Sequence, residues 1–138
     1  MTLEQERYFE HDADIGVIGR GASVERAFED AAAATFAIMT DPARVREAQT
    51  VRIEFDEADV ELALVTWLNL LIGEARGHGV VFSRFRLQHE GSHWFGEASG
   101  GAWRPELERG VEVKGATLTM LSVKDVDGAW EARCVVDV

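Results

Sequence analysis

The last residues of the chain alternate between apolar and polar side chains with a period of two, which is typical of a β-strand and not of an α-helix. Directly before them comes Asp127-Gly128, a dipeptide strongly favoured in tight hairpin turns. The pattern predicts an antiparallel hairpin in which Leu118–Val123 pairs with Trp130–Val138, so that an apolar strand runs to the last residue. One face of that strand would carry Trp130, Ala132, Cys134, Val136 and Val138, and the other would carry Glu131, Arg133, Val135 and Asp137.

Two segments have the apolar spacing of amphipathic helices. The first begins after Ser23, whose hydroxyl suits a helix N-cap, and is stopped by Asp41-Pro42. The second covers Asp59 to Arg76 and ends before Gly77, because glycine tolerates the left-handed conformation of a C-cap. The apolar residues at helical spacing are Val24, Ala27, Phe28, Ala31, Phe36 and Met39 in the first, and Leu62, Val65, Trp67, Leu68, Leu71 and Ile72 in the second.

Short strand-like segments surround these helices. They are Arg7–Glu10, Ile15–Gly21, Val51–Phe55, a run from Val80 in which Val81, Phe85 and Leu87 alternate, and His93–Ala98 before the glycine-rich Ser99-Gly100-Gly101. This order of elements predicts an α+β fold: one domain over residues 1–138, a sandwich of mainly antiparallel sheet with two main helices packed on one side. With 46% apolar residues, the chain can bury a core of that kind.

The composition limits the classes of function. The chain has 25 acidic and 14 basic residues and a net charge of −11, which disfavours direct binding of nucleic acid and favours a basic protein partner. Cys134 is the only cysteine and lies on the predicted core face, which fits a reducing cytoplasm. The segment Met1–Glu6 lacks the pattern of a secretory signal, and no apolar run reaches the roughly 20 residues of a membrane span. We therefore expect a soluble, cytoplasmic protein.

Acidic residues stand near both ends of the chain. If the fold brings the ends together, Asp14, Asp137 and the α-carboxylate of Val138 could bind a hard cation such as Ca²⁺, Mg²⁺ or Mn²⁺, which prefer oxygen ligands. If Glu10–Asp14 is extended, Glu10, Asp12 and Asp14 would share one side, with His11 on the other. The plainer alternative, which composition alone favours, is that Asp137 faces solvent on an edge strand and Asp14 caps a turn.

Five segments match, in order, short motifs that one protein family carries. His11–Gly16 reads HDADIG where the family has HTADIG, with Asp12 in place of threonine. The other matches are Trp67–Leu71 for WLNEL, Gly96-Glu97 for a GE pair, Glu112–Thr117 for EVKAxT and Val135–Val138 for ILDI. Together they resemble the archease family over the whole chain.

The resemblance implies an accessory protein and not a stand-alone enzyme. Archeases assist the RtcB-type, GTP-dependent RNA ligase, which joins a cyclic or 3′-phosphate RNA end to a 5′-hydroxyl end in tRNA splicing and RNA repair. They promote guanylylation of the ligase and its repeated turnover. The family binds a divalent cation through positions that correspond here to Asp14, Asp137 and Val138, with Ca²⁺ as our first choice and Mg²⁺ or Mn²⁺ as alternatives. Lys114 is either a contact to ligase or nucleotide phosphate, or an exposed strand lysine.

The chain departs from the family pattern at positions where histidine, and then Tyr-His, are frequent. This chain has Leu107 at the histidine position and Leu118-Thr119 at the Tyr-His positions, so any role of the family's histidine and tyrosine side chains is absent or met differently. Two other classes of function stay open: a chaperone-like binding module with a structural metal site, and a metal-dependent hydrolase whose carboxylates activate water. The sequence leaves the native metal, the oligomeric state and the RNA substrate undefined.

Overall fold

We describe residues 6–138 in a computed structural model of the protein. Met1–Gln5 lie outside the described residues. They make up most of Met1–Glu6, the segment that lacks the pattern of a secretory signal. The helices are α1 (Val24–Ala37) and α2 (Val60–His78), with a short 3₁₀ turn η1 (Pro42–Arg44). The strands are β1 (Tyr8–His11), β2 (Asp14–Gly21), β3 (Gln49–Asp56), β4 (Val80–Glu90), β5 (His93–Ala102), β6 (Gly115–Ala116), β7 (Ser122–Val126) and β8 (Ala129–Asp137).

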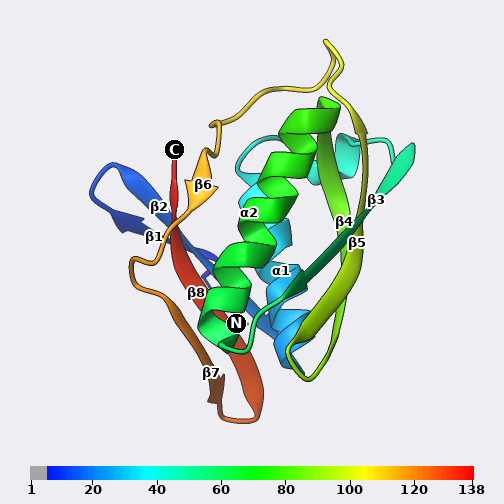
Figure 1. The fold of residues 1–138 in the computed structure, drawn as a ribbon. Coiled ribbons are helices and arrows are strands. Elements are labelled where there is room, and N and C mark those ends of the chain that lie inside the picture. The colour runs from blue at the N-terminus through cyan, green and yellow to red at the C-terminus, as the bar shows by residue number, and fades with distance from the viewer. Residues whose placement is uncertain (1–5) are drawn as a thin grey trace.

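The strands form two separate sheets with both helices between them (Figure 1). The larger sheet has the order β1-β2-β8-β6, with β7 also paired to β8, and the smaller has the order β3-β5-β4. Every strand pair among the described residues is antiparallel. The predicted α+β class, with two helices packed on antiparallel sheet, is therefore confirmed, and the sheet is split into two.

The core lies where the helices meet the two sheets. Trp67 of α2 and Phe28 of α1 are fully buried, and the Trp67 indole N–H donates to the Phe28 carbonyl at 3.0 Å. At Gly19 of β2, a side-chain Cβ would overlap the backbone of α1 at Ala27 and Ala31. Glycine is thus required there, because it lets the alanine-rich helix pack directly on the larger sheet.

Both predicted helices and their N-caps are confirmed, but α1 ends at Ala37, before Met39 and Asp41-Pro42, and the predicted end of α2 also differs. The Ser23 hydroxyl accepts from the Arg26 N–H at 3.2 Å, and Asp59 caps α2. Gly77 lies inside α2, so the prediction that it ends the helix is wrong: the left-handed C-cap is Gly79, with φ of 65°. Leu62, predicted on the core face, is 39% exposed because it lies in the first turn of the helix.

The predicted C-terminal hairpin is present but shifted. Asp127 and Gly128 both have positive φ, at 55° and 85°, as a two-residue type I′ turn requires. However, β7 begins only at Ser122, and Leu118 and Met120 before it are exposed. The smaller sheet also extends further than predicted. Strand β5 continues through Ser99-Gly100-Gly101, because these residues pair with β3 or β4.

Candidate metal centre

The two ends of the described chain meet in the larger sheet (Figure 1). Strands β2 and β8 are antiparallel with Ile15 opposite Val136, so the next position places Asp14 opposite Asp137. The Val138 N–H donates to Asp14 Oδ1 at 3.2 Å, across 124 positions of sequence. The meeting of the ends, on which the predicted cation site depends, is therefore a feature of the fold.

A third segment holds Asp137 from the other side of β8. Strand β6 places Gly115 opposite Asp137, and the Lys114 N–H donates to the Asp137 carbonyl at 2.8 Å. The Thr117 N–H and hydroxyl both donate to the Val135 carbonyl at 2.9 Å. The backbone around Asp137 is thus fixed by strands on both sides.

Asn69 of α2 fastens this third segment, a role that no sequence motif predicted. Its side-chain Oδ1 accepts from the Ala116 N–H at 2.8 Å, and its Nδ2 donates to the Ala116 carbonyl at 3.2 Å. The amide thus completes the hydrogen bonding of a two-residue strand. A single amide within the apolar run Trp67–Ile72 was the available signal.

The acidic residues near the start of the chain are arranged differently from the prediction. Asp12 lies in the β1–β2 turn with φ of 52°, and its side chain is 93% exposed. Because the chain reverses there, His11 stands opposite Asp14 while Glu10 stands opposite Ile15. Facing residues share a side of the sheet, so His11 and not Glu10 lies on the side of Asp14. The prediction that Glu10, Asp12 and Asp14 share one side is wrong.

The donor set at this end of the sheet fits a hard cation, provided that main-chain oxygen takes part. Within residues 6–138 no group of three or more His, Cys, Asp or Glu side chains is placed to hold a metal. Asp14 and Asp137 face each other, and neither forms an ion pair with a basic side chain of the described residues. Facing like charges are unfavourable, so a cation would relieve them. The third donor predicted from the sequence is the carboxylate of Val138.

The remaining positions singled out in the sequence fall into two groups. Lys114 is exposed beside Asp137, and its ammonium has no ion-pair partner among the described residues. Leu118 is 63% exposed, and the Thr119 carbonyl accepts from the Val135 N–H at 3.1 Å. Leu107, by contrast, is 4% exposed and belongs to the core. Lys114, Leu118 and Thr119 therefore present atoms near the Asp137 end of β8, whereas Leu107 does not.

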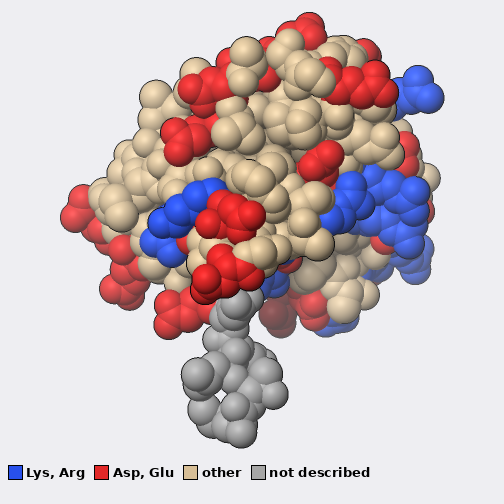
Figure 2. Space-filling model, turned by 90° about the horizontal axis from the view of Figure 1, so that it is seen from below, with Lys and Arg blue, Asp and Glu red and all other residues tan. Residues whose placement is uncertain are grey.

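The surface charge agrees with the composition. Figure 2 shows acidic side chains distributed over the face seen from below, with basic side chains gathered in a few places. Burial raises the pKa of the Cys134 thiol to about 12, so this cysteine is an inert part of the core. None of the helices in residues 6–138 has the length and apolar character needed to cross a membrane.

Comparison with known proteins decides the family. The sequence matches the archease protein family (MTH1598/TM1083) over residues 7–138. It is 34% identical to the archease of Sulfolobus acidocaldarius over 134 residues, covering 95% of this chain and 96% of that protein. It is 33% identical to the archease of Methanothermobacter thermautotrophicus over 135 residues, with 95% and 96% covered. The chain belongs to the archease family.

Solved structures share the fold of this archease. The solution structure of Methanobacterium thermoautotrophicum protein 1598 matches with a TM-score of 0.80 at 31% identity, covering 96% of this chain and 97% of that one. The crystal structure of a Thermotoga maritima protein, described as an archease and possible chaperone, matches with a TM-score of 0.67 at 20% identity. It covers 99% of this chain and 100% of that one, and it supports the fold.

The archease-like segments are not spread evenly over the fold. His11–Gly16, Glu112–Thr117 and Val135–Val138 lie together at one end of the larger sheet, and Asn69 of Trp67–Leu71 bonds to the second of them. Gly96-Glu97 lies apart, in the central strand of the smaller sheet. The candidate metal centre is therefore where most of the family-like sequence converges.

Proposed function

We propose that this archease is an accessory protein of an RtcB-type RNA ligase in the cytoplasm. It would promote guanylylation of the ligase by GTP, and hence repeated turnover in tRNA splicing and RNA repair. Asp14, Asp137 and Val138 would hold a divalent cation, Ca²⁺ or else Mg²⁺ or Mn²⁺. The net charge of −11 supports a route through a basic partner in place of direct RNA binding.

The observation that carries the proposal is the hydrogen bond from the Val138 N–H to Asp14 Oδ1. It joins two family-like segments from opposite ends of the chain, and together with the register of β2 and β8 it supports a position of the Asp14 carboxylate close to that of Asp137. Packing of Ile15 and Val138 against the core accounts for the meeting of the ends, but not for the exposed carboxylate of Asp137. A cation-binding role does explain it.

The residues of the chain would orient the ligand carboxylates and supply charge for contacts with the ligase. The pairing of β8 with β2 and β6 fixes the Asp137 backbone, and its carboxylate would lie beside that of Asp14. His11, opposite Asp14, would lie next to the ion or pair with a ligand, and Asp12 would face solvent. Exposed Lys114 would contact a phosphate or an acidic group of the ligase. When bound, the cation would neutralise phosphate charge at the partner's active site.

We expect the isolated protein to bind the cation weakly. Ca²⁺ takes about six to eight oxygen ligands, and three carboxyl groups leave several positions for water or for groups of the partner. Ca²⁺ and Mn²⁺ titrations of the isolated protein should therefore show low affinity, and the ligase should increase it.

The decisive experiment is multiple-turnover RNA ligation by the cognate ligase with GTP and Mn²⁺, with and without this protein. The unmodified chain should stimulate turnover. Asp14→Asn, Asp137→Asn and a one-residue extension after Val138 should each abolish stimulation while leaving the melting temperature near its original value. Failure of the unmodified chain to stimulate would reject the accessory role, and full activity of all three variants would reject the metal mechanism.

Asp127→Asn is the matched control. It makes the same chemical change at the opposite end of β8, and it keeps the hairpin because Asn-Gly also favours a type I′ turn. This variant should stimulate the ligase as well as the unmodified chain does.

A chaperone-like binding module is the second candidate. It is favoured by the exposed apolar side chains of Leu118 and Met120, which are 63% and 53% accessible beside the candidate metal centre. This function predicts suppression of aggregation of unrelated proteins that is lost in a Leu118→Ser, Met120→Ser double variant and is unaffected by Asp14→Asn.

A further inference from the structure

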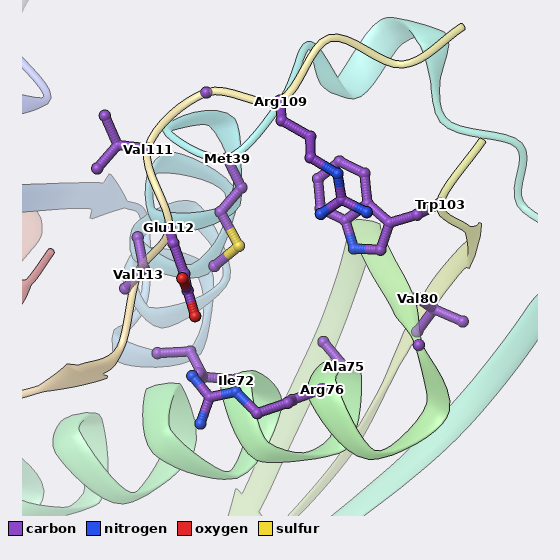
Figure 3. Close-up of a pocket in the computed structure, with 12 residues that line it drawn as sticks. Met39, Ile72, Ala75, Arg76, Val80, Trp103, Arg109, Val111, Glu112 and Val113 are labelled. Carbon is purple, nitrogen blue, oxygen red and sulfur yellow. The ribbon is translucent and has the colours of Figure 1, made fainter. Parts of the chain in front are cut away.

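A cavity of about 330 Å³ lies between the C-terminal half of α2 and the loop that leads from β5 to β6 (Figure 3). It is separate from the candidate metal centre, and none of Asp14, Asp137 or Val138 lines it. Its floor is apolar, formed by Ile72 and Ala75 of α2 and by Val80 of β4. Cavities of roughly 300–1,000 Å³ with apolar lining and a few polar groups are the usual form of small-molecule sites.

Two arginines stand over this floor. Arg109 lies over the Trp103 ring, with its guanidinium carbon 4.0 Å from the ring centroid, and Arg76 extends along α2 past Ile72 on the opposite side of the cavity (Figure 3). Among residues 6–138, neither arginine forms an ion pair. Other arginines of the described chain also lack an ion pair, but Arg76 and Arg109 are the two that line this cavity.

The one acidic side chain of the lining is Glu112, across the cavity from Trp103 (Figure 3). It makes no ion pair with Arg76 or Arg109 within the described residues. Both guanidinium groups therefore keep their hydrogen-bond donors available for an acceptor from outside, and Glu112 would compete with it. Guanidinium groups bind carboxylates with charge-assisted, often bidentate, hydrogen bonds.

We propose that this cavity binds a small amphipathic anion, a carboxylate carried on a flat apolar body. The apolar part packs on Ile72, Ala75 and Val80, and the carboxylate binds Arg109 on the Trp103 side, while Arg76 adds positive charge from the opposite side of the cavity. Arg109 is already ordered by Trp103, so less side-chain freedom is lost when an anion binds. The site does not depend on the function proposed above.

Indole-3-acetate is a suitable probe, and indole-3-acetamide is its uncharged analogue of nearly the same shape. Both are titrated into the full chain labelled with ¹⁵N, and the amide signals of Gly79 and Gly110 and the indole signal of Trp103 are followed by NMR. The acid should shift these signals and bind about tenfold more tightly than the amide, because only the acid engages the arginines. Equal binding of acid and amide, or absence of shifts at the cavity, would overturn the proposal.

Variants localise the effect. Arg109→Ala should weaken binding of the acid by about tenfold, and Arg76→Ala should weaken it by about threefold, while both leave binding of the amide within about twofold. Glu112→Gln should tighten binding of the acid, because it removes the competing carboxylate. The matched control is Arg52→Ala, an exposed arginine of β3 that also lacks an ion pair in the described chain and lies outside the cavity. If Arg52→Ala weakens binding as much as Arg76→Ala does, the recognition is not local and the proposal fails.

Discussion

The two sheets are built from different parts of the chain, although each packs one face on the same pair of helices. The smaller sheet uses one continuous stretch, from Gln49 to Ala102, and two of its strands form a hairpin. The larger sheet joins residues 8–21 to residues 115–137, so its central pair of strands is almost the full length of the chain apart. Only the larger sheet can therefore bring residues of both chain ends into one site.

Carboxylates of the smaller sheet and those at the Asp137 end of the larger sheet also have different neighbours. Across the smaller sheet, Glu97 stands between Arg52 and Arg86, and His93 contacts both Glu54 and Asp56. Carboxylates there have basic neighbours within the chain. At the end of the larger sheet, Asp14 and Asp137 face each other without one. Elsewhere in the larger sheet Glu131 pairs with Arg20 and Arg133, so the contrast is confined to the Asp137 end of β8, where the two carboxylates lack a basic partner among the described residues.

The largest effect should come from Trp67, because it joins the helices that both sheets share. Trp67→Ala removes a fully buried ring and leaves the Phe28 carbonyl without its donor, so it should lower the free energy of unfolding by about 3–5 kcal/mol. Urea unfolding followed by circular dichroism measures this. Hydrogen exchange should accelerate in both sheets alike; acceleration in one sheet only would contradict a shared core.

A smaller and local effect should follow from removing the Asn69 amide. Asn69→Ala loses two hydrogen bonds to Ala116 and should cost about 1–2 kcal/mol. The amide of Thr117 should exchange faster while amides of the smaller sheet keep their protection. Gln88→Ala, on the exposed face of β4, is the control and should change neither. Equal acceleration in both sheets would show that Asn69 supports the whole fold and not only the candidate centre.

Trp67 and Asn69 also show which features can be predicted from sequence patterns. Trp67 lies in an apolar helical pattern, so its burial could be predicted, as could Ser23 as a cap and Asp127-Gly128 as a turn, because each depends on neighbours in sequence. The split into two sheets could not, since strand pairing between distant segments leaves no local signal. The side that Glu10 faces was predicted wrongly for a related reason: the turn at Asp12 reverses the chain and changes which residues face Asp14.

The third effect is a pH dependence of the free energy of unfolding, caused by Cys134 in the larger sheet. Burial raises the pKa of Cys134 in β8 to about 12, from an ordinary value of 9.0. Above pH 9 the unfolded chain loses this proton and the folded chain keeps it, so stability should fall with pH between about 9 and 12. The slope from this group approaches about 1.4 kcal/mol per pH unit. Unfolding measured across that range should be steeper for the unmodified chain than for Cys134→Ala; identical slopes would refute the assignment.

The smallest effect should come from His93, which tests whether the smaller sheet supplies its own positive charge. The hydrogen bond to Asp56 raises the pKa of His93 above 6.5, and the charges of Asp56 and Glu54 add to the increase. A raised pKa means that the stabilisation is present below the unfolded pKa and is lost as pH rises through the folded value. Asp56→Asn should therefore lower the pKa of His93 toward 6.5 in an NMR titration, and Asp125→Asn, in the larger sheet, should not. An unchanged His93 pKa in Asp56→Asn would mean that this carboxylate is not neutralised by histidine. The contrast with the facing Asp14 and Asp137 would then lose its basis.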